Sequence, residues 1–98
     1  METFADLRSS SVPVLVDIYA EWCAPCRAMA PALKQLKDIQ GDNLRIIKIN
    51  IDKNPQIAQQ YAVHSVPTLM IFKDGKQLWR QSGAMSAHEL NKIVEQFK

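Results

Sequence analysis

Two cysteines, Cys23 and Cys26, lie three residues apart and are the only cysteines in the 98-residue chain. A Cys-x-x-Cys pair either forms a redox-active dithiol or supplies half of a zinc site. Structural zinc takes four ligands, and the two histidines, His64 and His88, do not have the spacing of a zinc-finger second half. No metal site is therefore expected, and thiol–disulfide exchange is the predicted chemistry.

The position of this pair in the chain also favours redox chemistry. Residues 12–19 form a near-continuous apolar run rich in β-branched side chains, which predicts a strand buried on both faces. A helix follows, so Cys23 is expected at a helix N-terminus, where free N–H groups stabilise a thiolate. The pKa of such a thiol falls from about 8.5 to between about 3.5 and 7.5. We therefore expect Cys23 to attack and Cys26, almost one turn later, to resolve the mixed disulfide.

The two residues between the cysteines refine this expectation. Pro25 has a fixed φ that suits a first helical turn, and it has no N–H to donate. Neither Ala24 nor Pro25 carries a charge that would stabilise a thiolate further. A pKa of about 7 for the Cys23 thiol and a reducing couple are therefore expected.

The elements that must position the cysteines follow from periodicity and turn signals. Pro31 should kink the helix after the cysteines, Gly41 should end it, and Asp74-Gly75 predicts a hairpin. We expect further helices over residues 2–9 and 55–61 and from the capping box at 86–89 onward, and further strands over residues 44–52, 68–72 and 77–81. A parallel βαβ unit followed by a hairpin predicts one α/β domain, residues 1–98, with a mixed sheet covered by helices on both faces.

Composition narrows the range of partners. The net charge is +2 and the basic residues are scattered, so no nucleic-acid partner is expected. No apolar stretch approaches the roughly 20 residues of a membrane span. The first residues lack a basic region followed by an apolar one, so no signal peptide is visible. We therefore expect a cytoplasmic protein with no membrane association.

Several motifs together resemble the thioredoxin family, in order and over essentially the whole chain. They are residues 16–27, 48–55, 66–68, 72–75 and 83–84. The resemblance implies a three-layer sandwich and a protein disulfide reductase with no cofactor beyond its own Cys23-Cys26 disulfide. It also implies disulfide-containing proteins as substrates and a thioredoxin reductase or equivalent electron donor as partner.

The resemblance also implies roles for individual residues. Asp17 is expected to be a buried proton acceptor for Cys26, and Lys48 its cationic neighbour, with a solvated strand lysine as the alternative reading of Lys48. A cis bond is expected between Val66 and Pro67, opposite the disulfide. Residues expected to shape the site are Trp22, Ala24, Pro25 and Pro67, and those expected to bind extended substrate are Trp22, Val66, Pro67, Ser82 and Gly83.

The chain departs from the family pattern at three places. Ala24 replaces the usual glycine, which leaves the reduction potential and the choice of partners open. Tyr19 stands where tryptophan is common. The usual first strand has no counterpart, so residues 44–51 are expected to form a sheet edge. We expect residues 2–9 to form a helix, and this edge to be bare or used in self-association of an otherwise monomeric protein.

Two alternative functions remain. A disulfide oxidase or isomerase is disfavoured because no histidine precedes Cys26. A thioredoxin-like binding subunit, in which redox chemistry is incidental, is disfavoured by the intact cysteine pair and Asp17.

Overall fold

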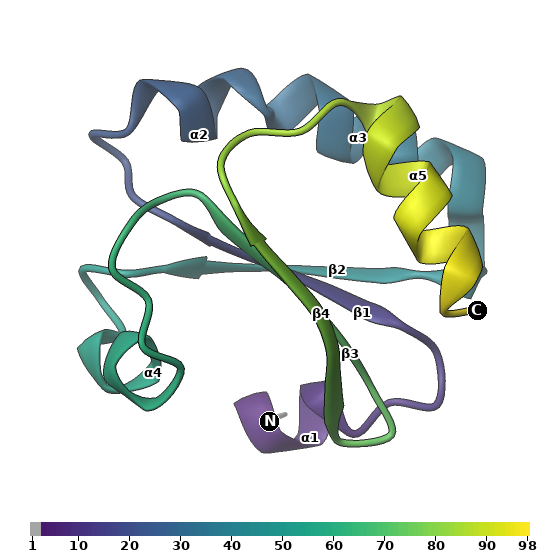
Figure 1. Ribbon diagram of the computed structural model, residues 1–98, viewed down its shortest axis with the longest axis horizontal. Coiled ribbons are helices and arrows are strands. Elements are labelled where there is room, and N and C mark those ends of the chain that lie inside the picture. The colour runs from purple at the N-terminus through teal and green to yellow at the C-terminus, as the bar shows by residue number, and fades with distance from the viewer. Residues whose placement is uncertain (1–2) are drawn as a thin grey trace.

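Four strands form one mixed sheet in the computed structural model, which describes residues 3–98 (Figure 1). They are β1 (Val14–Tyr19), β2 (Arg45–Asn50), β3 (Thr68–Lys73) and β4 (Lys76–Ser82). The order across the sheet is β2-β1-β3-β4. Strand β1 is parallel to β2 and antiparallel to β3, and β4 is antiparallel to β3. The predicted mixed sheet is therefore confirmed.

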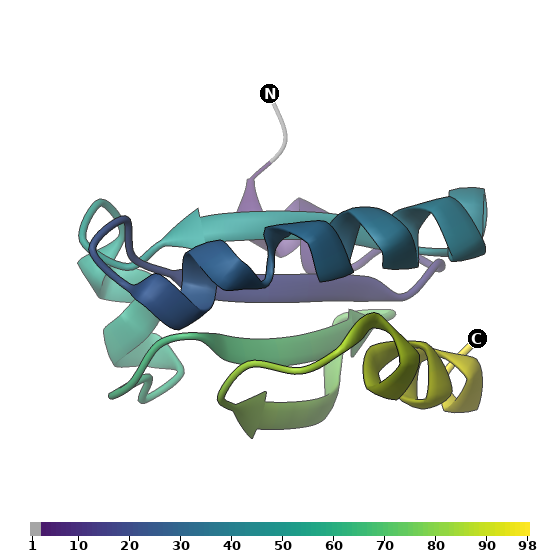
Figure 2. The same cartoon turned by 90° about the horizontal axis from the view of Figure 1, so that it is seen from above.

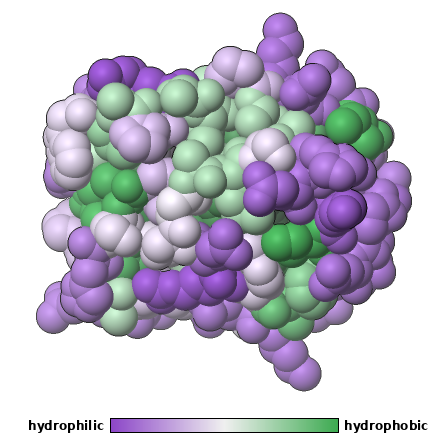
Figure 3. Space-filling model, turned by 45° about the horizontal axis from the view of Figure 1, so that its top comes forward, coloured by the Kyte–Doolittle hydropathy of each residue, from purple (hydrophilic) through white to green (hydrophobic). Residues whose placement is uncertain are grey.

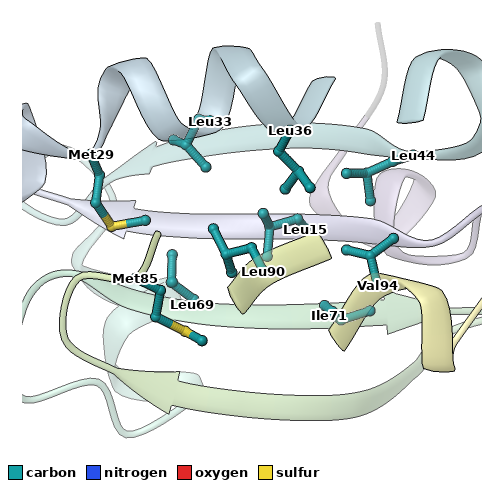
Figure 4. Close-up of a cluster of buried hydrophobic side chains, with 10 residues drawn as sticks. All are labelled: Leu15, Met29, Leu33, Leu36, Leu44, Leu69, Ile71, Met85, Leu90 and Val94. Atoms are coloured by element: carbon teal, nitrogen blue, oxygen red, sulfur yellow. The ribbon is translucent and has the colours of Figure 1, made fainter. Parts of the chain in front are cut away.

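Helices cover both faces of the sheet, as predicted. Helices α3 (Ala30–Gln40) and α5 (Ala87–Gln96) lie on one face, while α1 (Phe4–Arg8) and α4 (Pro55–Gln60) lie on the other (Figures 1 and 2). Figure 4 shows leucines of α3 and α5 meeting Leu15 and Leu69 of the sheet. On the opposite face, Val16 and Phe72 pack with side chains of α1 and α4. The fold is a three-layer sandwich.

Strand β1 lies inside the sheet because its side chains can be buried on both faces. Leu15 enters the core below α3 and α5, whereas Val14, Val16 and Ile18 enter the opposite core. All residues from Val14 to Ile18 are buried, including the carboxylate of Asp17.

The single kinked helix predicted after the cysteines is instead two helices, α2 (Ala24–Ala28) and α3. Met29 ends the first and begins the second, and its carbonyl accepts a hydrogen bond from the Leu33 N–H at 3.0 Å. The cause is Pro31, which has no N–H to donate to the carbonyl of Arg27 four residues earlier. Gly41, with φ of 55°, ends α3 as expected and begins the 3-10 turn η1 (Gly41–Asn43).

Strand β2 forms one edge of the sheet, and no strand of residues 3–98 lies beyond it (Figure 2). The predicted N-terminal helix is observed as α1, with Glu2 outside the described residues. Helix α1 is anchored to β3 and its hairpin and not to β2, because Phe4 packs edge-on against Phe72 and the carbonyl of Arg8 accepts a hydrogen bond from the Gly75 N–H at 3.0 Å. The edge at residues 44–51 is thus bare in the described part of the chain.

The predicted hairpin at Asp74-Gly75 joins β3 to β4. Both residues have positive φ, 53° and 81°, which suits a tight hairpin turn. None of the helices from residue 3 onward is long and apolar enough to cross a bilayer.

Candidate active site

A disulfide between Cys23 and Cys26 lies where the chain passes from β1 into α2. Cys23 is the N-cap of α2, and its sulfur accepts a hydrogen bond from the Cys26 N–H at 3.2 Å. Ala24 is the first residue of the helix, and Pro25 fits its first turn because a donor is not needed there. Both cysteines are buried, each with 4% of its surface exposed. The backbone at this position favours negative charge on the Cys23 sulfur.

An apolar wall surrounds the disulfide. The Val66 carbonyl oxygen lies 3.7 Å from the Cys23 sulfur, and the Val66-Pro67 bond is cis, as predicted. Ala20 and Ile51 also pack against the two cysteines. Sequence reasoning missed Ala20 and Ile51, although each directly follows a strand of the parallel pair, and ligands bind at this end of such strands.

The loop after β4 lies beside Pro67. The Gly83 N–H donates to the Pro67 carbonyl at 2.8 Å, and the Ser82 hydroxyl lies 3.2 Å from that of Thr68. Gly83 has a φ of 100°, which strongly favours glycine at this position. The structure therefore brings Gly83 and Ser82 to the same end of the sheet as Val66 and Pro67.

Trp22 is the largest exposed apolar side chain near the disulfide, with 69% of its surface accessible. Its indole N–H donates to the Asp52 carboxylate at 2.9 Å. Trp22, Asp52, His64 and Val66 are among the residues that line a pocket of about 190 Å³. Asp52 was missed as a site residue, and the one available signal was its place just after β2. In Figure 3, apolar surface lies on the left, at the end that carries α2, and continues across the upper middle, while the right-hand end is mostly hydrophilic with separate apolar patches.

Asp17 is fully buried in β1, and its carboxylate oxygens have no hydrogen-bond partner among the described residues. Alternate residues of a strand share a face, so Asp17 faces the same helix layer as Leu15, which belongs to the same buried cluster as Met29. Burial raises the pKa of Asp17 to about 6, and the charge of Lys48 acts in the opposite direction. The buried carboxylate predicted from the sequence is thus present.

Lys48 occupies the register position opposite Asp17 on β2, and its side chain is exposed. Its ammonium nitrogen lies 4.9 Å from the centre of the Tyr19 ring. Lys48 is therefore both an electrostatic neighbour of Asp17 and a cation over an aromatic face. Within residues 3–98, no group of three or more His, Cys, Asp or Glu side chains is arranged to hold a metal ion.

Comparison with known proteins agrees with this arrangement. A sequence model of the thioredoxin family matches residues 2–96. The chain is 46% identical over 90 residues to a thioredoxin of Acidithiobacillus ferridurans, covering 92% of this chain and 83% of that protein. It is 47% identical over 90 residues to a thioredoxin of Rhodospirillum rubrum, covering 92% of this chain and 86% of that protein.

The chain belongs to the thioredoxin family. The solved structure of a mutant thioredoxin from Halobacterium salinarum NRC-1 matches this thioredoxin with a TM-score of 0.85 at 33% identity. That match covers 95% of this chain and 80% of the other. As a thioredoxin, the protein is a thiol–disulfide oxidoreductase that reduces protein disulfides by dithiol–disulfide exchange, and the predicted reductase function is confirmed.

Proposed function

We propose that Cys23 is the attacking thiol of this thioredoxin and that Cys26 is the resolving thiol. The observation that carries the proposal is the backbone hydrogen bond from Cys26 to the Cys23 sulfur at the start of α2. In the reduced protein, the Cys23 thiolate attacks one sulfur of a substrate disulfide. A bond forms between Cys23 and that sulfur, the substrate S–S bond breaks, and the released thiolate takes up a proton.

Resolution of the mixed disulfide needs a second thiolate. The Cys26 thiol gives its proton to the Asp17 carboxylate, and the resulting thiolate attacks the Cys23 sulfur. The Cys23-Cys26 disulfide re-forms, and the second substrate thiolate leaves and is protonated. Two electrons have passed from the dithiol to the substrate. A carboxyl with a pKa of about 6 suits this transfer because it accepts and releases a proton near neutral pH. Lys48 keeps that pKa from rising further.

Extended substrate is proposed to bind along the wall opposite the disulfide. The backbone of Val66, next to Cys23, would pair with the substrate backbone, so recognition would depend little on substrate side chains. The apolar surface for this contact would come from Trp22, Val66, Pro67 and Gly83, with Ser82 at its margin. Ala24 and Pro25 would hold the first turn of α2 in place beneath the attacked bond.

The reduced state must be restored by a donor of two electrons. We propose a thioredoxin reductase or an equivalent dithiol donor for this step, and disulfide-containing proteins as the substrates. We further propose that residues 1–98 act as one domain, that the protein is a cytoplasmic monomer, and that self-association through residues 44–51 is at most weak. The last point rests on charge, because two β2 strands paired edge to edge would bring the Lys48 ammonium groups together.

Two cysteine variants test the assignment, and each serves as the folding control of the other because both lack the disulfide. Cys23→Ser should abolish the reduction of insulin disulfides. Cys26→Ser should retain the first step and accumulate a mixed disulfide with substrate, visible as an added mass. Undiminished turnover in either variant, or trapping by Cys23→Ser instead, would contradict the assignment.

The reduction potential tests the alternative of an oxidase. A potential of about −270 mV, the reference value for thioredoxin itself, is expected of a reductant, whereas one of about −120 mV marks an oxidant. The measurement is equilibration of the Cys23-Cys26 pair with glutathione buffers.

A further inference from the structure

A groove of about 480 Å³ runs between α3 and the open edge of β2. From α3 it is lined by Ala30, Leu33, Lys34 and Lys37, and from β2 by residues 45–48. Leu33 belongs to the buried core, and Ile46 packs against the same core, so the groove has an apolar floor. The cysteines do not line it.

The backbone along one side of this groove is ready to pair with another strand. The Arg45 N–H donates to the Pro13 carbonyl and the Ile51 N–H to the Tyr19 carbonyl, both in the direction of β1. Successive backbone groups of a strand point to opposite sides. The N–H and C=O groups of Ile46 and Lys48 therefore point toward the open edge, where residues 3–98 provide no strand.

Among residues 3–98, the charged side chains that line the groove all have the same sign. They are Lys34, Lys37, Arg45 and Lys48, and no aspartate or glutamate of this range lines it. Some of these cations already have local contacts. The Lys37 ammonium donates to the carbonyls of Gly41 and Leu44, and the Lys48 ammonium lies over Tyr19. Neither of these lysine contacts includes a carboxylate, so the lysines gather positive charge along the rim.

We propose that this groove binds an extended, acidic segment of a partner protein, which adds to the sheet as a strand beside β2. The backbone of the segment would pair with Ile46 and Lys48. Apolar side chains at alternate positions would contact Leu33 and Ile46, and carboxylates would approach Lys34 and Lys48. The binding is separate from dithiol exchange, because no cysteine takes part.

A second copy of this chain is the less suitable occupant. Its own edge strand would present Lys48 to the lysines of the same rim, and like charges on adjacent strands are destabilising. An acidic strand instead brings carboxylates to the lysines of the rim.

The probe is a capped seven-residue peptide of alternating glutamate and valine, and the control peptide alternates lysine and valine. Titration into the ¹⁵N-labelled oxidised protein should shift the amide signals of Ile46 and Lys48 and those along the groove side of α3. Hydrogen exchange at the Ile46 and Lys48 amides should slow by about tenfold or more at saturation, because these N–H groups become paired. The lysine peptide should leave the spectrum unchanged.

Two charge-reversal variants form the matched pair. Lys34→Glu, on the groove, should weaken binding of the acidic peptide by about tenfold, while Lys92→Glu, exposed on α5, should leave the affinity within about twofold. Both should reduce insulin disulfides at the wild-type rate. Binding should also persist when both cysteines are replaced by serine.

Three results would overturn the proposal. They are equal binding of the lysine peptide, an unchanged affinity of Lys34→Glu, and a dimer in sedimentation equilibrium whose β2 amides are protected without peptide. The last result would assign the groove to a second copy of the chain. Because insulin reduction is measured on the same variants, failure of the groove proposal is distinguishable from failure of the cysteine assignment.

Discussion

Asp17 and Lys48 lie opposite each other on the parallel strands β1 and β2, and no hydrogen bond joins their side chains. The carboxylate is buried and the ammonium is exposed over the Tyr19 ring. Lys48 therefore acts on Asp17 through its charge alone, and burial is the larger influence. The pKa of Asp17 rises to about 6 as a result, which leaves the carboxyl able to exchange a proton near neutral pH.

Replacement of Asp17 by asparagine should stabilise the oxidised protein at neutral pH. Below pH 3.8 the carboxyl is protonated in both the folded and the unfolded chain, so it carries no ionisation penalty. Between pH 3.8 and about 6 the Asp17 carboxyl is ionised in the unfolded chain but still protonated in the folded one, so stability falls as the pH rises. Above about pH 6 the folded state bears the full penalty of about 3 kcal/mol. Urea unfolding should show Asp17→Asn more stable by about 2–3 kcal/mol at pH 7, with the gain vanishing near pH 3.5. Asp38→Asn, at an exposed position, is the control and should show no such gain. An equal gain for Asp17→Asn at pH 7 and pH 3.5 would contradict the burial explanation.

Removal of the Lys48 charge should raise the pKa of Asp17 further. The ammonium favours the ionised carboxylate, so Lys48→Gln removes an interaction that lowers the pKa. Carbon-13 NMR of the Asp17 carboxyl across pH 4–9 in the oxidised protein measures the shift directly. Lys92→Gln, at an exposed position of α5, should leave the pKa of Asp17 unchanged. A midpoint that stays the same or falls in Lys48→Gln would show that Lys48 does not act on Asp17.

Loss of the Trp22–Asp52 hydrogen bond should impair substrate binding more than stability. Asp52→Ala removes the acceptor of the Trp22 indole N–H, and the freed indole can rotate away from the pocket beside Val66. Because Trp22 is largely exposed, the free energy of unfolding should fall by less than about 1 kcal/mol. The KM for insulin should rise by roughly threefold to tenfold, with a smaller change in kcat. Asp42→Ala, in the 3-10 turn, provides the comparison, and equal KM values in the two variants would count against a binding role.

Ala62 offers a site at which a substitution should stabilise the fold. Its φ is 52°, in the left-handed region that costs a residue with a Cβ about 1–2 kcal/mol. Its carbonyl accepts a hydrogen bond from the Arg80 guanidinium at 2.9 Å, so the conformation is held in place. Ala62→Gly should raise the free energy of unfolding by about 0.5–1 kcal/mol in urea titration. Ala5→Gly, within α1, should lower it by a similar amount or less, and destabilisation by both would refute the strain argument.

Much of this fold follows from local sequence patterns. The apolar run in β1, the Asp74-Gly75 turn and the Ser86 capping box each act within a few residues, and each was predicted near its observed position. The helix break at Met29 was missed because one proline can either bend a helix or divide it, and packing decides between the two. The pairing of Val66 with the disulfide came from family resemblance, since Val66 and Cys23 are 43 residues apart in the chain.

Contacts between distant elements explain the other omissions. The Trp22–Asp52 hydrogen bond and the Lys48–Tyr19 contact each join side chains about 30 residues apart. Neither has a signature in the residue spacing, because both depend on how the ends of β1 and β2 meet. The groove beside β2 likewise follows from the strand order, which periodicity does not determine.

The placement of β1 between β2 and β3 also has a consequence for the newly made chain. This strand leaves the ribosome early, but its antiparallel partner and the turn that anchors α1 are made about 55 residues later. At about 5–20 residues per second, roughly 3–11 s pass during synthesis before the sheet can close around β1. During that interval the most apolar strand of the protein is exposed, which makes it the segment best suited to early capture by a chaperone.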